Sequence, residues 1–268
     1  MAFLNRLGLP AKLALAVLAL LAAVLVFGPM LYEASPTAVA STERLQPPSL
    51  AHPLGTDQFG REVLARVLAG GQQSLRIAAI TTLLTVLIGG TMGLAAGYLR
   101  RLDEVLMRIC DAFMALPAVI LAIALMAVSE PSEANVILAL VVVYTPRMAR
   151  LVRSRALLIR EMPYVEAALA LGARSTRIVL RHVLPNALPE IIVLGSFIFG
   201  YAILDEAALS FLGVGAPPPA PSWGNMLSEA RYLVREAFWI SFFPGLFIGI
   251  TVLAVNLLGD GIRDAGQH

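Results

Sequence analysis

The sequence predicts an all-α, polytopic membrane protein with about six transmembrane helices. Hydrophobic residues make up 58% and charged residues 14% of its 268 residues, whereas average soluble domains contain roughly 45–50% apolar and about 25% charged residues. A helix needs ~20 apolar residues to cross ~30 Å of hydrocarbon. Three windows meet this length without a charge, namely residues 13–32, 77–99 and 237–259. The whole chain, residues 1–268, is therefore expected to form a single transmembrane domain.

Residues 13–32 form the first expected span. Arg6 and Lys12 precede it, and a basic flank followed by apolar residues also occurs in signal peptides. This stretch is about twenty residues long, however, and lacks a clear small-x-small cleavage site before Glu33. We therefore expect an uncleaved anchor helix.

A long outer segment, residues 33–76, follows the anchor. It contains Pro47-Pro48 and the turn-rich stretch 52–57, and both are typical of loops. Directly afterwards, valines and leucines in 62–68 recur at helical spacing. The pattern predicts a short amphipathic helix on the outer membrane surface.

Three further segments are apolar but carry charges at or near an end. The first begins beside Asp111, and the second extends past Arg147. The third includes Asp205 and Glu206, which are acceptable in a span if they face a protein interior. These segments complete the six spans, at residues 112–129, 134–152 and 191–210. An alternative ends the fifth span at Leu204 and leaves both acids in solvent.

The arginines indicate the orientation. The chain has 19 arginines and one lysine, and fourteen of these twenty basic residues share a side with the N-terminus. Short, strongly basic loops stay in the cytoplasm. We therefore expect both termini and the basic segment 153–190 to be cytoplasmic. The net charge of +2 is too small to indicate a nucleic-acid partner.

Several kinds of chemistry are missing from the sequence. The single lysine, Lys12, is followed by leucine, so no P-loop can bind ATP here. The single cysteine, Cys110, excludes an intrachain disulfide and a cysteine-based metal cluster. The glycine-rich stretch Gly89–Gly97 lies inside an expected span, where small residues favour close helix packing over a nucleotide loop.

The segment 153–190 is polar yet strongly helical. Pro163 suits a first helical turn, Glu166 suits the positive helix N-terminus, and Gly172 can close the helix in a left-handed conformation. Ser175 can cap a second helix, Thr176–Leu184, that Pro185 would end. One face of the first helix would present Val165, Ala168, Leu169 and Gly172. Two interpretations stay open: a tether between two spans, or an elbow that docks into a groove of a cytoplasmic partner.

The residues Glu166-Ala-Ala168, Gly172 and Leu184-Pro185 resemble the cytoplasmic EAA signature of binding-protein-dependent importer permeases. That family often has isoleucine where this chain has His182. Segments from the first outer loop to the C-terminus resemble the peptide and nickel branch of the family, in particular its second, C-type permease subunit. They are His52–Asp57, Gly60–Glu62, Asp111–Pro117, Arg181–Asn186, Glu206–Gly213, Pro221–Gly224, Phe243–Gly245 and Asn256–Asp264.

The resemblance implies a type I ABC importer in a bacterial inner membrane, with segment 153–190 as its coupling segment. This chain would pair with a homologous second permease subunit, two cytoplasmic ABC ATPases and an extracytoplasmic solute-binding protein. ATP and Mg²⁺ would be bound by the ATPases, so this chain would need no cofactor of its own. The residues that correspond to the ATPase-coupling signature are Glu166, Ala167, Ala168, Gly172, Ala173 and Pro185.

Four residues are candidates for lining or gating the pore: Asp111, Pro117, Asp205 and Glu206. Arg108, one helical turn before Asp111, is its expected partner. Pro117 is expected to kink its helix. In the outer part of the chain, Trp239 is expected to act as an interfacial anchor.

Two other classes of function remain as alternatives. A passive channel or membrane scaffold would share the same hydrophobic pattern. An intramembrane enzyme would need paired catalytic groups, but adjacent residues such as Asp205 and Glu206 point ~100° apart on a helix. No feature of the sequence distinguishes a dipeptide from an oligopeptide or nickel as the solute.

Overall fold

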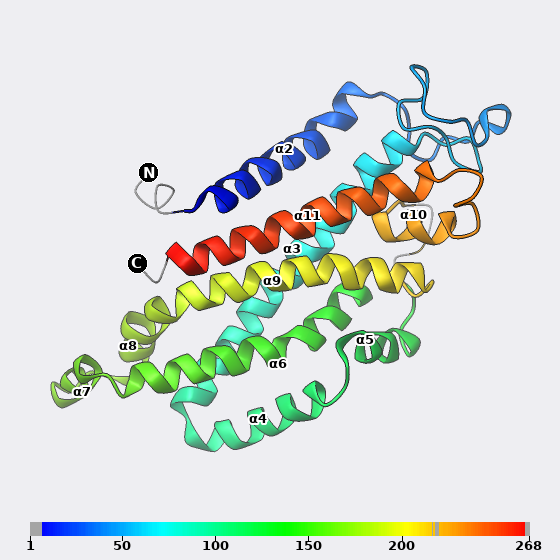
Figure 1. Ribbon diagram of the computed structural model, residues 1–268. Helices are drawn as coiled ribbons and strands as arrows, with labels where there is room; N and C mark the ends of the chain where they lie inside the picture. The colour runs from blue at the N-terminus through cyan, green and yellow to red at the C-terminus, as the bar shows by residue number, and fades with distance from the viewer. Residues whose placement is uncertain (1–6, 216, 218–219, 266–268) are drawn as a thin grey trace.

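The computed structural model describes residues 7–215, 217 and 220–265, which form a helical bundle (Figure 1). Within this part of the chain, β pairing is limited to an isolated bridge between Thr56 and Glu62. The elements are α2 (Leu9–Leu31), η1 (Ser41–Glu43), α3 (Val63–Tyr98), α4 (Arg100–Met114), α5 (Ala118–Ala127), α6 (Glu133–Arg160), α7 (Pro163–Ala170), α8 (Ser175–Ile178), the π-helical turn η2 (Val179–Val183), α9 (Leu184–Phe211), α10 (Trp223–Ala230) and α11 (Trp239–Ala265).

Five helical segments in the described chain are long and apolar enough to cross a membrane, and the number is six if the bent pair α4–α5 crosses as one broken span. The predicted all-α membrane fold with about six spans is therefore confirmed. The start of α2, the end of α11 and α7 lie at one end of the bundle, whereas α10 and the loop before α3 lie at the other (Figure 1). We call these the α7 end and the α10 end.

The expected separation between a surface helix at 62–68 and a span at 77–99 is wrong. α3 is one continuous helix of 36 residues from Val63 to Tyr98. Gly70 and Gly71 lie within it, and a Cβ added at Gly71 would come within 2.7 Å of the Trp223 ring. The glycines allow α10 to pack against α3, and this tertiary contact outweighs their low helix propensity.

The expected span at 112–129 is broken. α4 and α5 are bent by 91° across residues 115–117. Proline lacks the N–H of a helical hydrogen bond and disfavours a helical residue before it. Pro117 therefore stands directly before α5, at its N-cap, rather than at a kink within one helix.

The glycines at 89, 93 and 97 face α6, as the small-residue pattern predicts. An added Cβ would lie 2.7 Å from the Met148 Cβ at Gly89, 2.5 Å from the Ala149 carbonyl oxygen at Gly93 and 2.6 Å from the Ala156 Cβ at Gly97. The two helix backbones approach each other closely along this row. Gly90, in contrast, has open space around it.

Candidate functional site

The segment between α6 and α9 begins with the helix that the sequence predicts. Pro163 occupies the first position of α7, and Gly172 ends the helix with a φ of 78°. The Gly172 N–H donates to the Leu169 carbonyl at 2.9 Å, and the Ala173 N–H donates to the Ala168 carbonyl at 3.0 Å. These two bonds form a Schellman motif, which needs the left-handed residue that glycine supplies.

The expected second helix, Thr176–Leu184 ended by Pro185, is wrong. α8 passes through the π-helical turn η2 directly into α9, and Pro185 lies in the first turn of α9. Arg174, not Ser175, stands at the N-cap of α8. A first-turn proline needs no N–H partner, and the wide turn before it, closed by Leu184 N–H to the Val179 carbonyl, lets the chain continue as a helix.

The predicted apolar face of α7 is divided differently in the structure. Val165 is fully buried in the main core, together with Ile178 and Val183. Tyr164, Leu169 and Leu171 are instead exposed, with Leu171 at 89%. Val165 therefore attaches α7 to the bundle, while three large side chains of this segment remain exposed.

Glu166 is exposed on α7. Among the residues that the structure describes, its carboxylate forms no hydrogen bond or ion pair. Tyr164 packs against His182 with ring centroids 5.9 Å apart, which joins α7 to η2. The segment that follows α7 in sequence carries three exposed arginines, namely Arg174, Arg177 and Arg181.

Asp205 and Glu206 both lie within α9, so the alternative of a span that ends at Leu204 is wrong. Glu206 is 1% exposed and accepts hydrogen bonds from Ser74 Oγ at 3.0 Å and Ser210 Oγ at 2.8 Å. Ser74 Oγ also accepts a hydrogen bond from the backbone N–H of Trp223 at 3.3 Å. These bonds link α3, α9 and α10. Glu206 is therefore an internal hydrogen-bond centre and does not face an aqueous path in this structure.

Asp205 has a different environment from its neighbour. The Tyr144 hydroxyl of α6 donates to Asp205 Oδ2. Arg147 lies one turn after Tyr144 on α6, and its charge attracts the Asp205 carboxylate. Arg147 is exposed in the single chain, and it forms no ion pair or hydrogen bond with any residue in the described ranges.

Two ion pairs connect α4 to α6 nearer the α7 end. Asp111 pairs with Arg150, and Asp103 pairs with Arg153. The prediction that Asp111 pairs with Arg108 is therefore wrong. The packing of α4 against α6 brings Arg150 to Asp111 instead of Arg108, which lies on the same helix. Together with Arg147 and Asp205, these pairs form a polar stripe along α4, α6 and α9.

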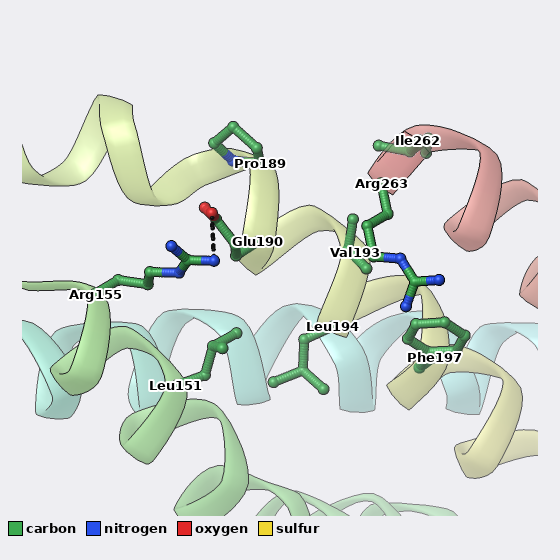
Figure 2. Close-up of a pocket in the computed structure, with 9 residues that line it drawn as sticks. All are labelled: Leu151, Arg155, Pro189, Glu190, Val193, Leu194, Phe197, Ile262 and Arg263. Atoms are coloured by element: carbon green, nitrogen blue, oxygen red, sulfur yellow. Dashed lines mark ion pairs between the residues drawn. The ribbon is translucent and has the colours of Figure 1, made fainter. Parts of the chain in front are cut away.

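A pocket of about 380 Å³ lies between α6, α9 and α11 near the α7 end (Figure 2). Arg155 and Glu190 pair across it at 2.9 Å. Arg263, the other cation of its lining, pairs with Asp260 on its own helix at 3.3 Å. Both arginines thus have carboxylate partners, unlike Arg147. Histidine, cysteine and acidic side chains form no metal-binding group in the described part of the chain.

At the α10 end, the outer loop is held by a buried charge cluster that the sequence analysis did not identify. Arg61 pairs with Asp57 at 2.6 Å and with Glu229 at 2.5 Å. Arg66, 2% exposed, also pairs with Glu229 at 3.0 Å. Asp57 and Arg61 belong to the segments 52–57 and 60–62, which stood out in the sequence. The partner of Arg61 on α10, Glu229, is more than 160 residues away in sequence, so the pairing could not be inferred.

Two aromatic side chains complete this end. Trp239 is only 7% exposed, and its indole N–H donates to the Thr56 carbonyl at 3.1 Å. It therefore anchors the outer loop to α11, and the expected membrane-interface role is wrong. Tyr32 follows α2, and burial, together with the nearby Glu62 carboxylate, raises the pKa of its hydroxyl to about 12. The phenol therefore stays protonated at physiological pH.

The fold and these sites define a polytopic helical membrane protein with a short exposed helix, α7, at one end and a polar stripe between its spans. The chain belongs to the family of binding-protein-dependent transport system inner membrane components, whose model matches residues 85–266. It is thus a permease of the ABC importer type and a multi-pass membrane protein.

Several relatives are similar over most of the chain. A putative peptide transport system permease protein of Brucella suis is 48% identical over 252 residues, which cover 94% of this chain and 84% of the relative. The dipeptide transport system permease protein of Alkalihalophilus pseudofirmus is 42% identical, with 90% and 79% covered. An inward-facing structure of the MetNI methionine ABC transporter has the same fold, with a TM-score of 0.63, 21% identity and coverage of 75% and 96%.

Proposed function

We propose that this chain forms half of the translocation pore of an ATP-driven importer for peptides or related small solutes. Relatives named as peptide and dipeptide permeases support this solute class. A homologous second permease subunit would supply the other half of the pore. ATP and Mg²⁺ would bind to two separate ATPase subunits, and this chain would have no catalytic site of its own.

The single observation that carries the proposal is the geometry of α7. A buried Val165 holds the helix to the bundle, while Glu166 and Leu169 stay exposed without a partner inside the described chain. Such a rigidly attached helix with an exposed apolar and charged surface suits a groove on a cytoplasmic ATPase. α7 would then transmit movement of the ATPases to α6, which precedes it, and to α9, which follows it through α8 and η2.

The coupling requires a difference in affinity. ATP can shift a conformational equilibrium only if it binds one state better than the other. The gap between two ATPases would change on ATP binding, and α7 in each permease subunit would convert this change into rocking of the helix bundle. The pore would open alternately to the two sides of the membrane.

The positive-inside rule supports a cytoplasmic position for the α7 end and both termini, because the basic residues are concentrated there. The α10 end would then face the extracytoplasmic solute-binding protein. The buried cluster of Asp57, Arg61, Arg66 and Glu229 would hold the loop before α3 against α10. The solute-binding protein would then meet a rigid surface at this end.

Two glycines allow a matched test of α7. Gly172 and Gly213 both have a positive φ, 78° and 82°, both close a helix through the same bond pattern, and neither has a neighbour near an added Cβ. The helix ends that they close, the C-terminal ends of α7 and α9, lie at opposite ends of the molecule (Figure 1). Proline cannot adopt this φ and lacks the N–H that each glycine donates.

We expect Gly172→Pro to reduce the ATPase that co-purifies with the tagged transporter about tenfold, equivalent to about 1.4 kcal/mol. Gly213→Pro should leave this association near the wild-type level. Glu166→Arg should also reduce it, whereas Glu236→Arg, at an exposed acid outside α7, should not. Equal ATPase recovery from all four variants and wild type would remove the support for this function.

A further inference from the structure

Arg147 lies near the middle of α6 (Glu133–Arg160), yet it is exposed and has no ion pair within the described chain. A cation without a partner on a membrane-spanning helix is costly unless it faces a water-filled cavity or a counter-charge, or reaches the lipid headgroups. The other arginines of the polar stripe, Arg150 and Arg153, are paired with acids of α4. Arg147 is therefore the cation of this stripe that is available to a ligand.

Asp205 provides the complementary charge. Arg147 follows Tyr144, the hydrogen-bond partner of Asp205, by one turn on α6, but Arg147 and Asp205 do not form an ion pair and so are more than 4 Å apart. The Tyr144 hydroxyl holds Asp205 Oδ2, which leaves the other carboxylate oxygen for a ligand. An extended dipeptide likewise carries its two opposite charges apart, at most about 7 Å from each other.

The surroundings of Arg147 add an apolar component. A small cavity of about 70 Å³ between α4, α5 and α6 is lined by Arg147 and Tyr144 together with apolar side chains. The break at Pro117 makes room for it, because the residues on both sides of the break, Leu116 and Ala118, contribute to its wall. Asp205 does not line this cavity, which is much smaller than the roughly 300–1,000 Å³ of typical ligand pockets, so it supplies an apolar wall beside Arg147 and not the whole site.

We propose that Arg147 and Asp205 form a binding site in the translocation path that contacts both charged ends of a zwitterionic peptide. Arg147 contacts the α-carboxylate, since guanidinium and carboxylate form strong bidentate hydrogen bonds. Asp205, positioned by Tyr144, contacts the α-ammonium group. This inference rests on the proposed function and deepens it, because it assigns part of the substrate selection to the permease itself.

The test uses the complete transporter in proteoliposomes with its binding protein. Uptake of dialanine and of dialaninamide, which lacks the carboxylate, is measured at concentrations that calorimetry shows to saturate the binding protein. The binding protein is the same in every sample, so a change in the ratio of the two uptake rates originates in the permease. Arg147→Gln is compared with Arg155→Gln, a control on the same helix whose arginine is paired with Glu190.

We expect Arg147→Gln to lower dialanine uptake about tenfold, the effect of losing hydrogen bonds between charged groups, and to leave dialaninamide uptake and ATP hydrolysis nearly unchanged. Arg155→Gln should preserve the wild-type ratio. Asp205→Asn should selectively lower uptake of dialanine relative to N-acetyl-dialanine.

Three outcomes would overturn the inference. An unchanged uptake ratio in Arg147→Gln would show that the arginine does not select the carboxylate. An equal loss for both solutes would assign it to coupling. Loss of the second permease subunit from the purified variant would place Arg147 in the subunit interface. Failure of the wild-type transporter to import any peptide would instead contradict the proposed function, and the inference with it.

Discussion

At the scale of single residues, adjacent acids have opposite environments. Asp205 and Glu206 differ by ~100° in direction on α9, so Asp205 points toward Tyr144 while Glu206 is enclosed between α3 and α10. Both acids were predicted to line or gate the pore. The structure retains Asp205 in the polar stripe and moves Glu206 into the protein interior.

Glu206 should contribute to stability through its hydrogen bonds to Ser74 and Ser210. We expect Glu206→Ala to lower the free energy of unfolding by about 2–4 kcal/mol, because it leaves buried hydroxyls unpaired and creates a cavity. Glu206→Gln keeps an acceptor oxygen and should cost about 1 kcal/mol or less. Thermal unfolding of the purified transporter in detergent measures both. Identical unfolding of the Ala and Gln variants would contradict this role.

At the scale of elements, the packing of α3 against α6 depends on how closely two backbones approach. Glycines at 89, 93 and 97 lie four residues apart and therefore on one face of α3, where α6 covers them. Gly90 lies off this face and has free space. The small-residue pattern predicted close packing, but it could not identify which glycine of the Gly89-Gly90 pair makes the contact.

Gly93→Ala and Gly90→Ala form a matched pair that tests this contact. The Cβ at position 93 would lie 2.5 Å from the Ala149 carbonyl oxygen, and overpacking of this kind costs about 1–3 kcal/mol. Alanine at position 90 meets no atom and should stabilise the helix by up to about 1 kcal/mol. We expect the melting temperature to fall for Gly93→Ala and to stay equal or rise for Gly90→Ala. A fall of similar size in both variants would argue against the packing role.

At the scale of the whole molecule, the topology places α7 and the segment between α10 and α11 on opposite sides of the membrane. Glu166 and Tyr232, the latter 80% exposed, mark these two ends. Cys110 is 1% exposed and is the only cysteine, so its replacement by alanine provides a background for single-cysteine labelling.

In that background, a membrane-impermeant maleimide should modify Glu166→Cys in inside-out vesicles and spare it in intact cells. Tyr232→Cys should show the reverse pattern, and each variant serves as the control for the other. Labelling of position 166 from outside the cell would invert the topology and exclude contact with a cytoplasmic ATPase.

The sequence by itself determined the membrane class, about six spans, the α7 helix with its glycine end, and the resemblance that led to the family. These features depend on local composition, hydrophobic length and backbone chemistry, which short stretches of sequence contain completely. Helix ends were less predictable: α3 begins at Val63 and α8 continues into α9, because packing and a π-helical turn outweigh local propensities.

Only the tertiary structure decided which charges meet. Asp111 pairs with Arg150, and Arg61 and Arg66 share Glu229. Arg147 is left without an ion pair within the described residues, although the same helix carries several other arginines that are paired. Charge pairing acts over a few ångströms in space, and residues far apart in sequence reach that distance only after the helices have packed.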